Sequence, residues 1–391
     1  MLFSDDLLKQ SLACAQTSRH DVFAQGVSDE VTAGLPFWLR GHRKKYSSPL
    51  RWPGDSGRAS QKGGMVLLLT RSQIVSVLEM EDVIAAVEKA HADMSTGDSL
   101  NLGSVSGSLP GSSALMIPMA AVSADGTGGV KLLTDTPDNQ ARGLPRQMST
   151  IALVDTISGI CEAFLDGAAI TQIRTAAASA VATKLLARED ATVLGFIGAG
   201  SLAKSHLRAI RAVRSIGRIV VWSRSKETAS RFVRFAEGEG VPAEFLTSPR
   251  DVTIASDILC TLTPSPEPIV LGRWFRPGLH VNAVGSPPRK NYREIDSDGI
   301  CLSRVVVDCL AEVLEKSGDV NFALAEGAIK QDHFEEELGQ ILTGARPRRT
   351  SETQITLYKS VGVAIQDVVT AQLVVSIARR RGLGTEVDLT T

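Results

Sequence analysis

Residues 193–210, VLGFIGAGSLAKSHLRAI, join an apolar run, a glycine-rich turn and an amphipathic segment. In a strand-turn-helix unit, one glycine permits a sharp turn, a second lets a pyrophosphate approach the backbone, and a small third residue lets helix and strand pack closely. A tight connection without a ligand is the alternative. Because a strand pattern precedes the turn and a helix pattern follows it, we predict a dinucleotide site. Its expected contacts are Gly198, Ala199, Gly200, Ser201, Leu202 and Ala203.

The next strand-like run ends in VVWSR, where such a site places the residue that contacts the ribose 2′ position. An acidic side chain there accepts from the 2′-hydroxyl of NAD(H) and repels the 2′-phosphate of NADP(H). This chain instead has Ser223, Arg224 and, two residues on, Lys226. We therefore predict that NADP(H) is favoured over NAD(H). The alternative is that Arg224 is a solvated surface charge.

Strand-like runs, which could position this turn, follow one another at short intervals between about 191 and 310. Helical stretches separate several of the runs, which is typical of a doubly wound parallel sheet. The strand-like runs are TVLGFIG, RIVVWSR, DILCTLT, LHVNAVG and RVVVDC.

The flanking segments have other patterns. A helix is expected over 80–94, with Val83, Ile84 and Val87 on one face, followed by short strands and a helical period near 168–187. This predicts an α+β unit. Residues 351–384 are expected to form one long helix that ends at Gly382 or Gly384. Residues 1–63 are basic and rich in Gly, Ser and Pro, which predicts a mobile arm without chemistry, unless the natural start is Met65.

The composition excludes several classes of protein. A formal net charge of -1 on 391 residues provides no overall field for nucleic acid or an anionic membrane, so a small molecule is the expected partner. The five cysteines are widely spaced, form no CxxC motif and are odd in number, which indicates reduced thiols and no metal site. No apolar stretch is long enough to span a membrane, and the first residues carry acids where a secretory signal needs bases. We expect a soluble, cytoplasmic protein.

Several motifs occur together in one order: GVKLLTDTPDN, GLP, FLDGAAITQIRTAAASA, GFIGAGSLA, LHVNAVGS and ITLYKSVGVAIQD. In order and spacing they resemble the ornithine cyclodeaminase/mu-crystallin family over residues 65–390. The resemblance implies a homodimer with a Rossmann domain inserted into an α+β dimerisation and substrate domain. The corresponding ranges are 64–188 plus 312–391 for the substrate domain and 189–311 for the NAD(P)-binding domain.

The resemblance also implies roles for two basic residues. Lys131 matches the family's active-site lysine and Arg174 its substrate-carboxylate arginine. A guanidinium holds a carboxylate in bidentate geometry, and a nearby lysine can neutralise charge or handle a proton. The alternatives are an edge-strand lysine and a helix-surface arginine. Thr175 is expected near the cofactor phosphates, whereas Asp367 is expected to cap a helix or tie the dimer.

At the end of a parallel strand, Asn282 and Gly285 are expected to contact the cofactor, because ligands of open α/β sheets bind at that edge. The next residues depart from the family. Cyclodeaminases place an aspartate after NAVG, whereas this chain has Ser286 and Pro287 there. Ketimine reductases carry a small or hydroxyl residue at this point, so we predict net reduction of a C=N bond, with Ser286 near the substrate.

A second departure is the absence of an early arginine in SLNLGSVSGS. Arg146 in GLPRQMS could replace it from an adjacent strand, and an additional cation would suit a substrate with a second carboxylate. The alternative for Arg146 is a surface arginine.

The predicted function is NAD(P)H-dependent reduction of a cyclic or linear 2-imino acid. Two alternatives stay open. One is ornithine or lysine cyclodeamination with bound NAD+. The other is a weakly catalytic protein of mu-crystallin type that binds NADPH and a ligand.

Overall fold

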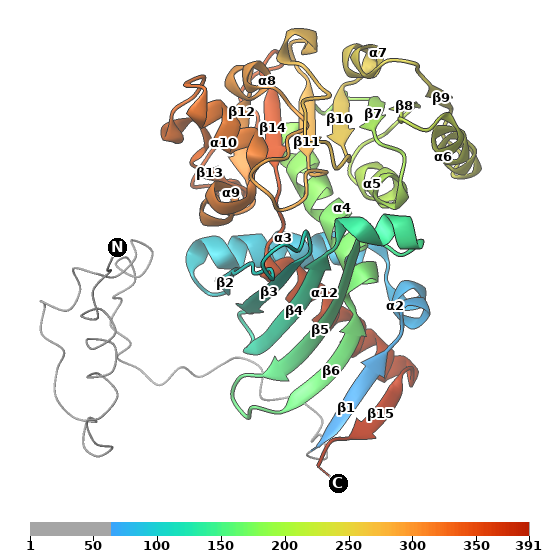
Figure 1. Cartoon of the computed structure of the whole chain (residues 1–391), viewed down its shortest axis with the longest axis vertical. Helices are drawn as coiled ribbons and strands as arrows, with labels where there is room; N and C mark the ends of the chain where they lie inside the picture. The colour runs from blue at the N-terminus through green and yellow to red at the C-terminus, as the bar shows by residue number, and fades with distance from the viewer. Residues whose placement is uncertain (1–63, 391) are drawn as a thin grey trace, which may run out of the picture. The chain divides into compact units, whose positions relative to one another are not determined.

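The computed structural model describes residues 64–390, and the expected arm at 1–63 lies outside this range. Figure 1 shows two sheets with helices packed against each of them. The predicted α/β class, with a doubly wound parallel sheet beside an α+β unit, is confirmed. Within residues 64–390 no helix is long and apolar enough to cross a membrane. The cytoplasmic location stays a prediction.

The first sheet has seven strands in the order β15-β1-β6-β5-β4-β3-β2. All neighbouring pairs are antiparallel except β1 and β6, which run parallel. Its strands are β1 (Met65–Leu69), β2 (Leu100–Ser104), β3 (Leu115–Val122), β4 (Thr127–Asp135), β5 (Gln147–Asp155), β6 (Cys161–Asp166) and β15 (Thr385–Asp388).

One face of this sheet is covered by helices. Helix α12 (Ala364–Arg381) packs on β2, β3, β4 and β5, and α2 (Arg71–Val77) contacts β6, while α3 (Met80–Thr96) packs against α12. The expected face of α3, with Val83, Ile84 and Val87, is buried. On the central strand β4, Lys131 and Leu133 are buried while Val130 and Leu132 are exposed, as the alternation of a strand requires. Side chains at 131, 133 and 135 therefore point from β4 toward the covered side.

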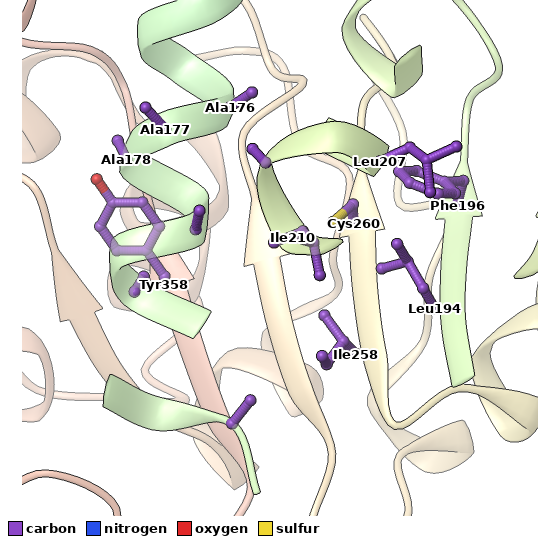
Figure 2. Close-up of a cluster of buried hydrophobic side chains, with 14 of the residues drawn as sticks. Ala176, Ala177, Ala178, Leu194, Phe196, Leu207, Ile210, Ile258, Cys260 and Tyr358 are labelled. Atoms are coloured by element: carbon purple, nitrogen blue, oxygen red, sulfur yellow. The ribbon is translucent and has the colours of Figure 1, made fainter. Parts of the chain in front are cut away.

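The long helix α4 (Gly167–Leu186) connects the two sheets (Figure 1). Asp166 caps its first turn by accepting from the Ala169 N–H at 2.9 Å. A run of alanines makes most of the helix narrow, so strands and other helices approach its backbone closely. Figure 2 shows Ala178 of α4 near the Tyr358 ring, and both belong to the same apolar cluster as Leu194 and Leu207.

The second sheet has eight parallel strands in the order β13-β12-β14-β11-β10-β7-β8-β9. They are β7 (Val193–Ile197), β8 (Arg218–Trp222), β9 (Ala243–Phe245), β10 (Ile258–Thr261), β11 (His280–Ala283), β12 (Arg304–Val307), β13 (Glu336–Glu337) and β14 (Thr356–Lys359). The accompanying helices are α5 (Ser201–Arg211), α6 (Lys226–Gly238), α7 (Pro249–Ala255), α8 (Ser297–Leu302), α9 (Leu310–Lys316), α10 (Gly318–Ala325) and α11 (Leu338–Leu342). Strands β8 and β9 follow β7 on one side, whereas β10 and β11 lie on its other side. The strand order therefore reverses at β7, and a ligand crevice is expected there.

The expectation of one long helix over 351–384 is wrong in its first part. Residues 356–359 form β14, which is fully buried in the second sheet, and α12 begins only at Ala364. The run Thr-Leu-Tyr-Lys has strand propensity, and Gly362 at φ +82° turns the chain before the helix. Strands β13 and β14 also lie within 312–391, so that range does not belong entirely to the substrate domain. The helix ends at Gly382 with φ +64°, which confirms the expected stop.

Candidate functional site

A cavity of about 450 Å³ opens where the carboxyl ends of the parallel strands face the first sheet. Its walls are β3, β4, the start of β5, the first half of α4, and the segments that follow β7, β10, β11 and β14. Lys131, Arg146 and Arg174 all line it, together with Lys316. No Asp or Glu is among the described residues that line it. Its lining thus favours an anionic ligand.

Lys131 and Arg174 share one buried carboxylate. The Lys131 ammonium donates to both carboxylate oxygens of Asp367, at 3.2 and 3.3 Å, and Arg174 Nε donates to Asp367 Oδ1 at 3.0 Å. The three side chains come from β4, α4 and α12 and are at most 5% exposed. Two cations against one anion leave one net positive charge at the cavity wall, which a substrate carboxylate can balance.

The surroundings of Lys131 make it a weaker base than an ordinary lysine. Burial, together with the charges of Arg174 and Lys316, lowers the pKa of Lys131 to about 8, although Asp367 acts in the opposite direction. Lys316 is itself paired with Glu312. An ammonium with this pKa can both hold an anion and release a proton near neutral pH.

Gln366 holds the Arg174 guanidinium in place, and Gly362 leaves space for it. Arg174 Nη1 donates to Gln366 Oε1 at 2.7 Å, and the Gln366 amide bonds to His91 Nε2 at 2.8 Å. Burial, together with the Arg174 charge, lowers the pKa of His91 to about 4, so this imidazole is neutral at pH 7. A Cβ on Gly362 would lie 2.9 Å from Arg174 Nη1, so a glycine leaves the room that the guanidinium needs.

The role expected for Asp367 requires correction. The sequence indicated a helix cap or a dimer contact, but the Asp367 carboxylate is the anion on which Lys131 and Arg174 converge. Asp308 is a second acid that the sequence analysis missed. It accepts from the backbone N–H groups of Val361 and Gly362 at 2.9 and 2.7 Å and thereby fixes the segment before α12.

A second shared carboxylate lies at the other end of the same strand face. Asp135 accepts from Arg146 Nε at 2.7 Å and from Arg289 Nε at 2.8 Å. Although burial alone would raise the pKa of Asp135, Arg146 and Arg289 hold it below its usual value. The Arg146 guanidinium also stacks over the Tyr292 ring at 5.3 Å. Arg146 is therefore not an isolated surface charge, and Asp135 and Arg289 are partners that the sequence analysis did not single out.

Ser286 lines the cavity, as expected, but its hydroxyl donates to the buried Asp319 at 3.1 Å. Behind it, Glu294 accepts from the N–H groups of Thr263 and Gly285 at 2.6 and 2.8 Å and so ties the ends of β10 and β11 together. Burial raises the pKa of Glu294 to about 7, and Asp319 contributes to this shift. Asp319 is itself neutralised by Lys359 at 2.7 Å.

The turn after β7 fits a dinucleotide phosphate. Gly198 has φ +105°, and a Cβ there would lie 2.8 Å from the Leu262 carbonyl oxygen, so the sharp turn needs a glycine. A Cβ on Gly200 would meet nothing within 4 Å, which leaves the backbone open to a ligand. Ala203 is fully buried. The other positions also suit contacts: Ala199 is buried beside the turn, while Thr175, Ser201 and Leu202 line the cavity.

The basic residues expected at the ribose lie after β8. Arg224 and Lys226 are exposed, and Ser223 is partly buried. Neither cation forms an ion pair with another described residue, so both are available to a phosphate. They lie outside the cavity lining, as a site for the far end of a dinucleotide would.

Asn282 does not lie where the sequence analysis expected it. Its side chain is fully buried and donates to Thr183 of α4 at 3.0 Å, and it does not line the cavity. The strand register turns it toward α4. Gly285, three residues later, does line the cavity, although its N–H is engaged by Glu294. For residues 64–390 there is no cluster of three or more His, Cys, Asp or Glu residues that could hold a metal ion.

Known proteins are similar to more than four fifths of this chain in sequence or in fold. The Δ1-pyrroline-2-carboxylate reductase of Bacillus cereus is 32% identical over 329 residues, which is 83% of this chain and 100% of that protein. The structure of the Thermococcus litoralis Δ1-pyrroline-2-carboxylate reductase with NADH and L-proline is similar, with a TM-score of 0.80, 35% identity, and coverage of 82% and 100%. An archaeal alanine dehydrogenase dimer with bound NAD has a TM-score of 0.79, 30% identity, and coverage of 83% and 99%.

The profile of one protein family matches residues 65–381 of this sequence. That range contains all strands of both sheets except β15, the glycine-rich turn, and both shared carboxylates with their basic partners. The chain therefore belongs to the ornithine cyclodeaminase/mu-crystallin family.

Proposed function

We propose that this protein is an NAD(P)H-dependent reductase that converts 2-imino acids into 2-amino acids. One observation carries the proposal: Lys131 and Arg174 share a single buried carboxylate at the wall of the cavity that also contains the end of the glycine-rich turn. Such a site binds a carboxylate and places the adjacent carbon beside a dinucleotide. The similar reductases of Bacillus cereus and Thermococcus litoralis support this assignment.

The carboxylate of the substrate is held by the donors that Asp367 and Gln366 leave unused. Within residues 64–390, Arg174 Nη2 donates to no hydrogen-bond partner, and Asp367 can accept at most two of the three Lys131 ammonium protons. Binding there neutralises the surplus charge of the cluster. Because all three side chains are buried, their positions are fixed before the substrate arrives, which lowers the entropic cost of orientation.

The reaction adds a hydride to C2 and a proton to nitrogen, so that imino acid, NAD(P)H and H+ give amino acid and NAD(P)+. Residues of the 198–203 turn would hold the cofactor phosphates at the N-terminus of α5. Lys131 carries the proton, because a pKa of about 8 lets its ammonium release it to the nitrogen near neutral pH. Once Lys131 has lost its proton it is neutral and attracts the product carboxylate less strongly, which favours product release.

Cyclodeamination is supported less well. That reaction needs an acid near the amine, and the position after β11 holds Ser286 instead. No Asp or Glu of residues 64–390 lines the cavity, and the nearby Asp319 is fully buried against Lys359. A binding protein without turnover is the remaining alternative, and the assay below distinguishes it.

The first prediction concerns activity. We expect the purified protein to oxidise NADPH or NADH with Δ1-pyrroline-2-carboxylate, with Δ1-piperideine-2-carboxylate, or with pyruvate or oxaloacetate plus ammonia. Arg174→Ala should lower kcat/KM by on the order of 100-fold, because a charge-assisted hydrogen bond to the substrate is lost. Arg250→Ala removes an exposed arginine of α7 and is the matched control.

Cofactor oxidation is followed at 340 nm, and ammonia release from ornithine is measured in parallel. Ammonia release without net cofactor change would show cyclodeamination, and silence in both assays would leave a binding protein. Either result would refute the reductase proposal.

We also propose that NADP(H) is preferred over NAD(H). Arg224 and Lys226 are exposed beyond the end of β8 and have no acidic partner among the described residues. The 2′-phosphate of NADP(H) carries charge that a guanidinium binds well, whereas NAD(H) offers only a hydroxyl. The similar structures with NADH or NAD do not decide this point for the present chain.

The second prediction tests that preference. Arg224→Ser combined with Lys226→Ser should raise KM for NADPH roughly tenfold or more and leave KM for NADH nearly unchanged, because only the phosphate contact is removed. Arg234→Ser, at an exposed position on α6, is the control. A wild-type protein that prefers NADH, or a double variant with an unaltered NADPH/NADH ratio, would exclude the proposal.

A homodimer is proposed as the assembly. The face of the first sheet opposite α12 carries apolar side chains that are exposed to water in a single chain. A dimer contact on this face would cover them. Val130 is 44% and Leu132 40% exposed, and Met148 and Phe164 lie on neighbouring strands. The similar archaeal alanine dehydrogenase is a dimer.

The third prediction concerns this face. Leu132→Asp should convert a dimer into a monomer at micromolar concentration, because a charge would be buried without a partner in the interface. Ile157→Asp changes an equally apolar but more exposed residue in the turn between β5 and β6, and should stay dimeric. Sedimentation velocity provides the mass of each species. A monomeric wild type would contradict the assembly.

A further inference from the structure

We propose that the substrate carries a second carboxylate, so that the enzyme reduces 2-imino dicarboxylates in preference to monocarboxylates. This inference rests on the proposed function and narrows its substrate class. The Asp135 cluster, formed by Asp135, Arg146 and Arg289, carries it.

The Asp135 cluster has more positive charge than its own acid requires. Asp135 is fully buried and one arginine would neutralise it, yet Arg146 and Arg289 both donate to it. Arg289 is also committed to the Ser113 carbonyl at 2.7 Å and does not line the cavity. Arg146 does line the cavity, while its Nε and Nη2 donate to Asp135 and its guanidinium also interacts with Tyr292. Arg146 is therefore the member placed to meet a ligand.

The charged side chains around the cavity leave a net positive charge at two separate places. Lys131 and Arg174 share Asp367, which leaves one positive charge, and the Asp135 cluster leaves another. Lys316 adds none, because it is paired with Glu312. A monocarboxylate balances only the first surplus. A dicarboxylate balances both, and the cavity lining offers no acid to do so.

The spacing of the two surpluses suits a short dicarboxylate. Lys131, Leu133 and Asp135 alternate on the buried face of β4, so the Cα atoms of Lys131 and Asp135 lie about 13 Å apart along the strand. Lys131 and Arg146 both line this cavity. Leu133 lines the cavity between them and can contact the methylene groups of the ligand. A single carboxylate cannot reach both ends.

The fourth prediction compares two imines of equal carbon number. Oxaloacetate plus ammonia supplies a dicarboxylate, and 2-oxobutyrate plus ammonia supplies a monocarboxylate. We expect kcat/KM to be at least about tenfold higher for the dicarboxylate. Arg146→Gln should lower the dicarboxylate-to-monocarboxylate ratio about tenfold, to a value near 1, because one charge-assisted contact is lost. Arg146→Lys, which keeps the charge, should retain most of the ratio.

A binding measurement makes the outcome independent of turnover. Calorimetry with NADP+ present should show that succinate binds more tightly than butyrate, and that Arg146→Gln removes the difference. Equal binding of both acids, or a substrate ratio unchanged by Arg146→Gln, would overturn the inference. Turnover of the monocarboxylate alone would overturn it while leaving the proposed function intact. Absence of turnover with both imines would refute the proposed function, and the calorimetric comparison would still decide the inference.

Discussion

The site depends on one constraint: a buried carboxylate must be neutralised, and Asp367 is neutralised by two cations from different elements. Removal of Asp367 would leave two buried cations without a counter-charge, which destabilises a protein strongly. The helix that carries Asp367 is held by apolar contacts, including Val368 and Ala371, in the core beneath the first sheet. The packing of α12 against β4 and α4 therefore determines where the surplus charge lies.

The second sheet contributes strand ends that are held in fixed positions. Its strand ends are fixed by buried acids that accept from backbone N–H groups, with Asp308 holding the segment before α12 and Glu294 holding the ends of β10 and β11. These acids do not line the cavity, but they position the segments that do. Rigid strand ends on one side and a fixed charge cluster on the other are the conditions under which a hydride donor and an imine carbon meet with little loss of entropy.

The sequence predicted the parts of the site that depend on local pattern. The turn at Gly198 and Gly200 follows from strand and helix periodicity, and the resemblance to a family placed Lys131 and Arg174 at what proves to be one cavity. The partners of those cations were not predictable in the same way. Asp367 is an ordinary polar residue at a helix start until tertiary packing buries it, and Asp135 and Arg289 are 154 residues apart in the chain. The error at β14 has a similar cause, because a strand whose residues are buried on both faces does not alternate between apolar and polar side chains.

The most direct test of the shared-carboxylate account is the pH dependence of carboxylate binding. With NADP+ present, the dissociation constant of pyrrole-2-carboxylate would be measured by calorimetry from about pH 6 to 10, a range in which its carboxylate stays ionised. Because the pKa of Lys131 is lowered to about 8, its charge is present below that pH and lost above it. The dissociation constant should therefore be constant at low pH, rise up to tenfold per unit above pH 8, and stay flat in Lys131→Arg. A constant value in the wild type, or the same rise in Lys131→Arg, would contradict the account.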